Sequence, residues 1–226
     1  MTPSTSATIS VVIVDDHPLF RRGLIQLLNT IPQFHLVGES SGGQAGIELV
    51  RRLHPDLLLL DLNMKGMDGL EVLKVVKRAD LDTRVIMVTV SDQAEDLVTA
   101  LRHGADGYLL KDMEPEQMVE SLQAAAAGQV IISDALTHLL AAALRGHKRP
   151  QSAQEADLTD QEARILERIA VGMSNKVIGK ELDIAEGTVK VHVKHILRKL
   201  GLKSRVEAAV WAVANLPPSR QRQGGG

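Results

Sequence analysis

Short apolar runs alternate with amphipathic segments through the first half of the chain, and this alternation constrains the fold more than any other feature. Unbroken apolar runs of this length are typical of strands that are buried on both faces. Strands that alternate with helices predict a parallel sheet with helices on both sides. We therefore expect an α/β domain with a five-stranded, doubly wound parallel sheet. The expected strands are residues 9–16, 35–40, 57–61, 84–90 and 107–112, and the expected helices are residues 18–31, 42–53, 68–79, 93–104 and 114–128.

The second half of the chain has helical spacing throughout, so it belongs to a different fold class. Thr159 followed by Glu162 forms a capping-box pattern, which marks the start of a helix. Segments 174–183 and 187–200 are separated by a tight connection, as in a helix-turn-helix, so we expect a small all-α domain. The expected division is an α/β domain at 8–130, a linker with a helix at 131–156, the helical domain at 157–216 and a disordered tail at 217–226.

Charge is divided unevenly between the two halves. Residues 1–156 hold 14 Lys and Arg against 20 Asp and Glu, a balance of −6, and residues 157–226 hold 12 against 8, a balance of +4. A basic domain suits a nucleic-acid partner, although scattered surface charge would give the same count. The absence of cysteine excludes disulfides and thiolate chemistry. No apolar run approaches the roughly 20 residues of a membrane span, and no signal peptide is evident, so we expect a cytoplasmic protein without membrane contact.

Polar side chains stand at the ends of four expected strands. Because ligands of open parallel sheets bind beyond the carboxyl ends of the strands, these side chains should converge. Crowded carboxylates need a cation, and oxygen ligands suit Mg²⁺, which binds phosphate alongside. A carboxylate can also act as a nucleophile and form an acyl phosphate, with a lysine and a hydroxyl holding the phosphoryl oxygens. Taken singly, each residue could equally be a helix cap, a strand residue or a solvated charge. The residues are Asp15, Asp16, Asp61, Thr89 and Lys111.

The motifs VDDHPLFRRGL, LLLLDLNMKGMDGLEVL, VTVSD and GADGYLLKDMEPE resemble the receiver domain of bacterial two-component response regulators. The resemblance implies a flavodoxin-like fold and Asp61 as the phosphoacceptor. It further implies a Mg²⁺ site made by Asp15, Asp16, Asp61 and the backbone carbonyl of Asn63. By the same resemblance, the residues that respond to the phosphoryl group are Thr89 as the switch hydroxyl, Tyr108 as the rotating aromatic and Lys111 as the phosphate-pairing lysine.

Lys65 departs from the pattern of this family, which usually has proline at that position. Proline would fix φ and stiffen the loop, whereas lysine leaves it looser and adds a cation near the phosphate. Lys65 is thus either a determinant of the phosphoryl lifetime or a solvated side chain.

The segment 187–200 has an apolar stripe on one helical face and a basic face opposite. The apolar stripe contains Val189, Val193, Ile196, Leu197 and Leu200, and the basic face contains Lys190, Val191, Lys194, His195 and Arg198. Lysines can bond guanine, and a valine can meet a thymine methyl, so the basic face suits a major groove. A solvated charged face would have the same composition.

The segment from Leu158 to Arg205 resembles the LuxR/FixJ-type helix-turn-helix, in which the helix after the tight turn is the recognition helix. Together the two resemblances cover about residues 9–214. The motifs DMEPE, TVKVHVKH and LKSRVEAAVW further resemble the nitrate/nitrite response regulators of this family. By resemblance, Lys190, Val191 and Lys194 match positions that read bases. From their charge or hydroxyl, we expect phosphate contacts from Thr188, Lys199, Lys203 and Arg205.

The last expected helix, residues 204–216, has a core stripe of Val206, Ala209, Val210 and Val213. Small residues beside the chain's one tryptophan fall on a different side of it, and they predict a dimer surface on DNA. Trp211 folding back over its own domain is the alternative. The predicted dimer residues are Ala208, Trp211 and Ala212.

The sequence therefore predicts a transcription regulator that a sensor histidine kinase activates by phosphorylating Asp61. We expect no enzyme activity beyond self-catalysed phosphoryl acceptance and autodephosphorylation. The expected partners are the kinase, a double-stranded DNA operator, a second copy of the chain on DNA, and RNA polymerase. One alternative is a Mg²⁺-dependent aspartyl-phosphate hydrolase, which usually has a second aspartate where Asn63 stands. Another is a degenerate receiver with constitutive DNA binding.

Overall fold

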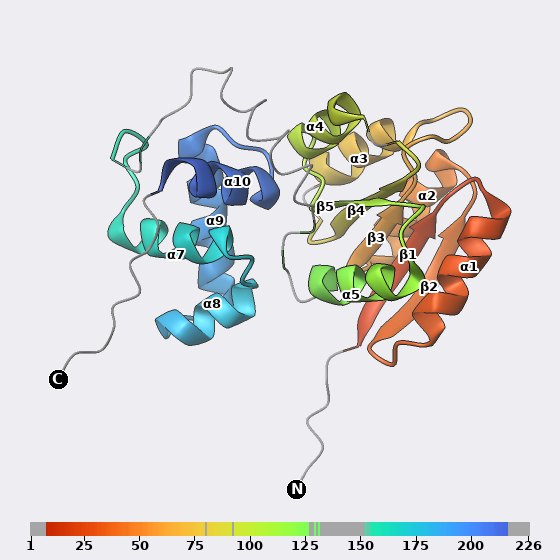
Figure 1. Cartoon of the computed structure of the whole chain (residues 1–226), viewed down its shortest axis with the longest axis horizontal. Helices are drawn as coiled ribbons and strands as arrows, with labels where there is room; N and C mark the ends of the chain where they lie inside the picture. The colour runs from red at the N-terminus through yellow and green to blue at the C-terminus, as the bar shows by residue number, and fades with distance from the viewer. Residues whose placement is uncertain are drawn as a thin grey trace, which may run out of the picture. The chain divides into compact units, whose positions relative to one another are not determined.

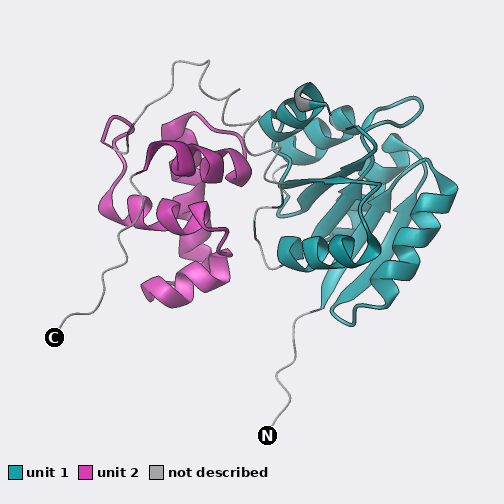
Figure 2. Cartoon of the chain, viewed as in Figure 1, with its two compact units in different colours: residues 1–133 teal, residues 134–226 magenta. Residues whose placement is uncertain are grey.

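The computed structural model describes residues 8–79, 81–91, 93–126, 129, 131, 152 and 154–216. The chain divides into two compact units, residues 1–133 and residues 134–226 (Figure 2). The predicted disordered tail and most of the predicted linker, including its helix, lie outside the described residues. Within the described part of the chain, no helix is long and apolar enough to cross a membrane.

The first unit contains a five-stranded parallel sheet with the order β2-β1-β3-β4-β5 (Figure 1). All four leucines of β3 are buried, with exposed fractions of 0–1%. Since both faces of this strand are covered, it needs no alternation of polar and apolar residues. The predicted doubly wound α/β fold is confirmed. The strands are β1 (Ile9–Val14), β2 (Phe34–Ser40), β3 (Leu57–Leu60), β4 (Arg84–Thr89) and β5 (Gly107–Leu110).

Among the described residues, five helices cover the sheet, on both faces (Figure 1). Helices α1 (Pro18–Asn29) and α5 (Pro115–Ala126) pack over one face, where Val11, Ile13 and Leu59 belong to the same apolar core as residues of both helices. The other face carries α2 (Gly43–Leu53), α3 (Gly69–Arg78) and α4 (Ala94–Arg102). The helices thus leave the carboxyl ends of the strands to their loops, where a parallel sheet binds ligands.

The described part of the second unit is helical, with α7 (Asp160–Ala170), α8 (Asn175–Leu182), α9 (Glu186–Leu200) and α10 (Arg205–Asn215). The predicted capping box at the start of α7 is confirmed, because Thr159 and Glu162 each accept the backbone N–H of the other. A Cβ on Gly179 would lie 2.6 Å from the Ile184 carbonyl oxygen, so the tight turn between α8 and α9 requires glycine there. The predicted all-α helix-turn-helix fold is confirmed.

Candidate functional site

The pairing of β1 with β3 places the carboxylates of Asp15 and Asp61 next to each other. Val14 and Leu60 are partners in the sheet, and the Asp61 N–H donates to the Val14 carbonyl at 2.8 Å. Asp15 and Asp61, which follow these partners, therefore leave the sheet side by side, each with only 2% of its surface exposed. The four leucines form the buried strand β3, and Asp61 is the first residue after it, so its carboxylate lies in the site at the end of the strand.

Lys111 reaches the same point from β5. Its backbone N–H donates to the Thr89 carbonyl at 2.8 Å, which aligns the ends of β4 and β5. Its ammonium lies 2.8 Å from Asp15 Oδ2 and 2.8 Å from Asp61 Oδ2, and its side chain is only 6% exposed. It also lies 4.8 Å from the centre of the Phe20 ring, in a cation–π contact. A buried lysine thus neutralises part of the charge of the two carboxylates.

The loop after β3 closes the site from the other side. The Asn63 N–H donates to Asp61 Oδ1 at 3.3 Å, and the Asn63 amide nitrogen donates to Thr89 Oγ1 at 3.4 Å. The Lys65 N–H donates to Asp16 Oδ2 at 2.9 Å. Where the loop returns, a Cβ on Gly69 would lie 2.1 Å from the Asp61 carbonyl oxygen, so only glycine allows α3 to begin so close to the site. All five residues predicted to converge are present in this cluster.

The electrostatics of Asp61 favour a cation nearby. Burial raises the pKa of Asp61 above its ordinary value, and the charge of Asp15 acts in the same direction. The hydrogen bond and charge of Lys111, together with the Asn63 N–H, oppose that rise in pKa. A divalent cation beside the carboxylate would stabilise the ionised form that a nucleophile needs.

The acidic residues fit a divalent cation by their spacing as well. Ligand atoms of Asp15, Asp16, Asp61 and His17 all lie within 4.8 Å of one another. Asp16 Oδ1 is buried and has no hydrogen-bond partner, which leaves it available as a ligand. Hard oxygen ligands in this number suit Mg²⁺. The contribution of the Asn63 carbonyl to such a site stays a prediction.

Thr89 and Tyr108 lie next to the pocket on β4 and β5. Thr89 is fully buried, and its hydroxyl accepts the Ser91 N–H at 3.1 Å. Tyr108 is 2% exposed, and its hydroxyl donates to the Ser91 carbonyl at 3.0 Å. The two side chains are thereby linked through one residue of the β4–α4 loop. Their roles as a switch stay predictions.

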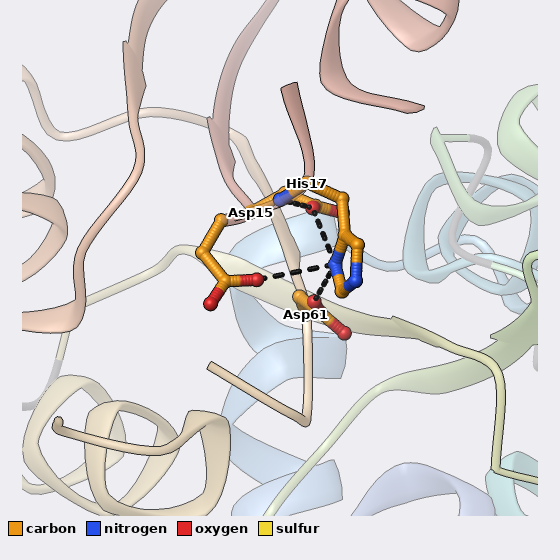
Figure 3. Close-up of side chains that lie close together, drawn as sticks. Asp15, His17 and Asp61 are labelled. Carbon is orange, nitrogen blue, oxygen red and sulfur yellow. Dashed lines mark hydrogen bonds and ion pairs between the residues drawn. The ribbon is translucent and has the colours of Figure 1, made fainter. Parts of the chain in front are cut away.

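His17 is the member of the site that the sequence reasoning missed. Its Nδ1 lies 3.4 Å from Asp61 Oδ2 and 3.7 Å from Asp15 Oδ1 (Figure 3). The same nitrogen lies 3.1 Å from Asp16 Oδ1. Its backbone N–H donates to Asp15 Oδ1 at 2.8 Å, which holds it at the start of α1. Its position directly after two aspartates was a signal that could have identified it.

The second unit presents the predicted base-reading residues of α9 on an exposed face. Lys190 and Lys194 are exposed, and Val191 is 53% exposed, whereas Val189, Ile196 and Leu200 are fully buried in the domain core. The separation into a buried and an exposed face is confirmed for these residues. The exposed Val191 side chain would be available to an apolar group such as a thymine methyl.

The four predicted phosphate-contacting residues differ in their surroundings. Thr188 and Lys203 are exposed. The Lys199 ammonium lies 2.7 Å from Glu162 Oε2 and donates to the Asp157 carbonyl, and Arg205 donates to Asn175 Oδ1 at 2.7 Å and to the Met173 carbonyl. Lys199 and Arg205 therefore also hold the domain together, and a phosphate contact by any of the four stays a prediction.

Helix α10 is more deeply buried than its sequence suggested. Val213, predicted to lie in the core stripe, is 65% exposed, so that prediction is wrong for this residue. The predicted dimer residues Ala208, Trp211 and Ala212 are 0%, 3% and 1% exposed. They cannot serve as an accessible surface in this conformation, and their role in a dimer stays a prediction.

Two known domain families match this chain. Residues 11–123 match the response regulator receiver domain, and residues 156–212 match the luxR family of bacterial regulatory proteins. The chain is 51% identical over 208 residues to the nitrate/nitrite response regulator protein NarL of Escherichia coli K12, covering 92% of this chain and 96% of that protein. It is 44% identical over 203 residues to a nitrate/nitrite response regulator homolog of Haemophilus influenzae, covering 89% and 95% of the two chains.

Solved structures give the same result. The signal receiver domain of a NarL response regulator from Mycobacterium tuberculosis matches with a TM-score of 0.53 and 38% identity, covering 54% of this chain and 99% of that chain. A structure of two RcsB dimers bound to two parallel DNAs matches with a TM-score of 0.55 and 25% identity, covering 92% and 98%. Because both domains match along one chain, the protein belongs to the NarL-like response regulators, which join a receiver domain to a LuxR-type helix-turn-helix DNA-binding domain.

Proposed function

We propose that a sensor histidine kinase phosphorylates Asp61 and that phosphorylation controls the binding of the helix-turn-helix domain to operator DNA. One observation carries the proposal: the nearly buried Asp61 carboxylate stands 2.8 Å from the Lys111 ammonium, at the point where β3 opens into the acidic cluster. A carboxylate next to a buried cation can hold the added charge of a phosphoryl group.

In the proposed reaction, an Asp61 carboxylate oxygen attacks the phosphorus of the kinase phosphohistidine. The bond from phosphorus to the histidine nitrogen breaks, and the acyl phosphate of Asp61 forms. Asp15, Asp16, Asp61 and the Asn63 carbonyl would hold Mg²⁺, which would supply positive charge for the phosphoryl oxygens. Lys111 pairs with one phosphoryl oxygen and Thr89 donates its hydroxyl to another. Hydrolysis of the acyl phosphate by water then returns the protein to its resting state.

We propose that the signal leaves the pocket through Thr89 and Tyr108, which are both hydrogen-bonded to Ser91. Thr89 accepts the Ser91 N–H, and Tyr108 donates to the Ser91 carbonyl, so a shift of Thr89 toward the phosphoryl group moves the loop that Tyr108 contacts. We propose that Tyr108 rotates in response, which changes the surface formed by α4 and β5. A local charge change then biases a two-state element.

On DNA, we propose that Lys190, Val191 and Lys194 read bases while Thr188, Lys199, Lys203 and Arg205 contact phosphates. A homodimer on DNA is supported by the RcsB dimers bound to DNA. For α10 to be its interface, the buried residues Ala208, Trp211 and Ala212 would have to become accessible when the dimer forms. RNA polymerase is the candidate downstream partner at promoters. Binding to chromosomal DNA would place the protein in the cytoplasm.

The signal is proposed from the relatives. The regulators of Escherichia coli and Haemophilus influenzae named above are nitrate/nitrite response regulators. We propose that this chain controls transcription in response to nitrate or nitrite, which the kinase senses. Genome-wide binding of the phosphorylated protein would test the assignment, which would fail if the bound promoters had no connection to nitrate or nitrite metabolism.

The phosphoacceptor assignment predicts that Asp61→Asn abolishes labelling by acetyl phosphate in the presence of Mg²⁺, because the amide is no nucleophile. Labelling is measured by mass shift of the full chain. Asp112→Asn, at an exposed aspartate beside Lys111, is the matched control and should label like the wild type. Undiminished labelling of Asp61→Asn would overturn the assignment, steady release of phosphate would indicate the hydrolase, and no labelling of the wild type would indicate a degenerate receiver.

A further inference from the structure

His17 adds a nitrogen ligand to a pocket whose other ligands are carboxylates. Its side chain is 61% exposed, and its Nδ1 faces Asp61 Oδ2 at 3.4 Å and Asp15 Oδ1 at 3.7 Å (Figure 3). Asp16 Oδ1 lies 3.1 Å from the same nitrogen. The phosphoacceptor chemistry described above does not use this nitrogen. The position of the His17 ring among the carboxylates therefore needs a separate explanation.

The spacing of these atoms is that of ligands around one metal ion. Donor atoms bound to an ion at about 2.1 Å stand about 3.0 Å apart in octahedral geometry and about 3.4 Å apart in tetrahedral geometry. The distances from His17 Nδ1 to the three carboxylate oxygens, 3.1–3.7 Å, fall near these values. The ligand atoms of all four residues lie within 4.8 Å of one another, so the side chains would move closer together to contact one ion.

The buried oxygens of the pocket have charged groups as their partners. Asp16 Oδ1 lies 3.1 Å from His17 Nδ1, and the Asp61 side chain is only 1% exposed. Asp61 Oδ2 has ion pairs alone, of which the closest is to Lys111 at 2.8 Å. Three carboxylates against one ammonium leave an excess of two negative charges, which one divalent cation would neutralise.

Lys111 occupies part of the space that such an ion would need. Its Nζ lies 3.5 Å from His17 Nδ1 and pairs with Asp15 Oδ2, the oxygen of Asp15 that points away from the ring contacts. An incoming ion would take over the charge that Lys111 now supplies to Asp61. Lys111 could keep its contact with Asp15.

We propose that His17, Asp16 and Asp61, with Asp15, bind a transition-metal ion of the zinc class, and that this ion blocks phosphorylation of Asp61. Imidazole nitrogen suits Zn²⁺ and its neighbours in the transition series, whereas Mg²⁺ prefers oxygen. Four protein ligands complete a tetrahedral zinc site and leave no position open. Mg²⁺ keeps positions open for phosphoryl oxygens, whereas a zinc site closed by these four residues would have none, so the pocket could not take up the phosphoryl group. Metal binding stands on the geometry alone, and the block rests on the proposed function.

The binding test uses the full chain, His17→Asn, and the matched control His35→Asn at an exposed histidine on β2. Zn²⁺ and Mg²⁺ are titrated separately by calorimetry, and Co²⁺ is titrated by visible absorption as a spectroscopic probe of nitrogen ligation. Because the chain has eight histidines, the His35 variant measures background binding. We expect His17→Asn to weaken Zn²⁺ and Co²⁺ binding by about 10–100-fold, to change the Co²⁺ spectrum, and to affect Mg²⁺ binding much less.

Equal zinc affinity in the wild type and His17→Asn would overturn the proposal. An equal loss of Zn²⁺ and Mg²⁺ affinity would also overturn it, because His17 would then only orient the carboxylates.

A second experiment tests the block of phosphorylation. The protein is labelled with acetyl phosphate and Mg²⁺ in the presence of increasing Zn²⁺. We expect Zn²⁺ to suppress labelling of the wild type and of His35→Asn at concentrations that leave His17→Asn labelled. Equal suppression of all three would overturn the block. If the wild type is not labelled even without Zn²⁺, the proposed function fails, and so does the block, while the titrations still decide whether the metal site exists.

Discussion

At the scale of single residues, Lys65 donates a backbone hydrogen bond to the acidic pocket that proline could not donate. Its N–H donates to Asp16 Oδ2 at 2.9 Å, and its side chain is exposed. Proline has no N–H, so the residue usual in this family would leave that oxygen without this donor. The departure from the family pattern therefore reaches the acidic pocket through the main chain.

Lys65→Pro and Lys65→Ala separate the backbone from the charge. Lys65→Pro should weaken Mg²⁺ binding by about 2–10-fold, since the net value of one such hydrogen bond is about 0.5–1.5 kcal/mol. Lys65→Ala keeps the N–H and should retain the Mg²⁺ affinity. Fluorescence or calorimetric titration with Mg²⁺ measures this, and the loss of labelled protein over time gives the phosphoryl lifetime of each variant. If Lys65→Pro binds Mg²⁺ as the wild type does, the bond to Asp16 has no role in the site.

The sequence predicted the residues of the pocket that stand at strand ends, because strand register alone brings them together. Asp15, Asp61 and Lys111 follow paired strands, so their convergence needs only the parallel order of the sheet. His17 was missed because its place in the pocket depends on the orientation of one ring at a helix N-terminus. The bond from Lys65 to Asp16 depends on the path of a loop, which carries no periodic signal.

At the scale of secondary-structure elements, the pair of Glu162 and Lys199 ties α7 to α9. The Glu162 side chain is 4% exposed, and its Oε2 lies 2.7 Å from Lys199 Nζ. Burial favours a higher pKa for Glu162. The hydrogen bond and positive charge of Lys199, together with the hydrogen bonds of Thr159, have the larger effect and hold the pKa below its ordinary value of 4.5. The pair thus favours the charged carboxylate in the folded domain.

A carboxyl whose pKa is lowered by folding stabilises the folded state above its unfolded pKa and loses that effect as pH falls through the folded value. Lys199→Ala should therefore destabilise the helix-turn-helix domain at pH 7 by about 1–3 kcal/mol, and the difference from wild type should shrink below pH 4.5. Thermal unfolding across pH measures it. Lys203→Ala, at an exposed lysine on the same domain, is the control. A pH-independent difference would assign the effect of Lys199→Ala to packing.

The exposed face of α9 gives a second prediction at this scale. Lys190→Ala should weaken binding to operator DNA by about 1–3 kcal/mol and relax specificity at one base position, because a base contact is lost. Lys203→Ala should weaken binding to all duplexes alike and reduce the salt slope by about 1, as loss of a phosphate contact does. Anisotropy titrations of operator and scrambled duplexes over a range of salt distinguish them. If Lys190→Ala weakens both duplexes equally, Lys190 reads no base.

Helical periodicity predicted the faces of α9 better than those of α10. In α9 one face is exposed, so the apolar stripe separates clearly from the basic face. In α10 every residue from Val206 to Ala212 is buried, while Val213 is 65% exposed. A helix buried on all sides has no polar face to mark its orientation, which is why both the core stripe and the dimer surface were difficult to predict there.

At the scale of the whole molecule, the two domains carry opposite net charges, −6 for residues 1–156 and +4 for residues 157–226. Opposite charges attract at low ionic strength, although screening at physiological salt limits the effect. The exposed lysines and Val191 of α9 form a face that an acidic neighbour could cover. These features motivate the hypothesis that the receiver domain restrains the DNA-binding domain until Asp61 is phosphorylated. Two-domain organisation itself followed from sequence, because the change from mixed to purely helical spacing is visible without a structure.

The restraint hypothesis predicts that a fragment of residues 151–226 binds operator DNA more tightly than the unphosphorylated full chain. Phosphorylation adds negative charge beside Lys111 and Thr89, which can shift an equilibrium between docked and separated domains. A coupling free energy of about 1–3 kcal/mol, or roughly 5–150-fold in affinity, is enough for regulation.

Anisotropy titrations at matched DNA-bound stoichiometry would compare the fragment, the full chain, and the full chain treated with acetyl phosphate. The treated chain should approach the fragment, and Asp61→Asn should not respond to the treatment. If the fragment binds no better than the untreated chain, the receiver domain does not restrain the DNA-binding domain. Phosphorylation must then act chiefly by promoting dimerisation.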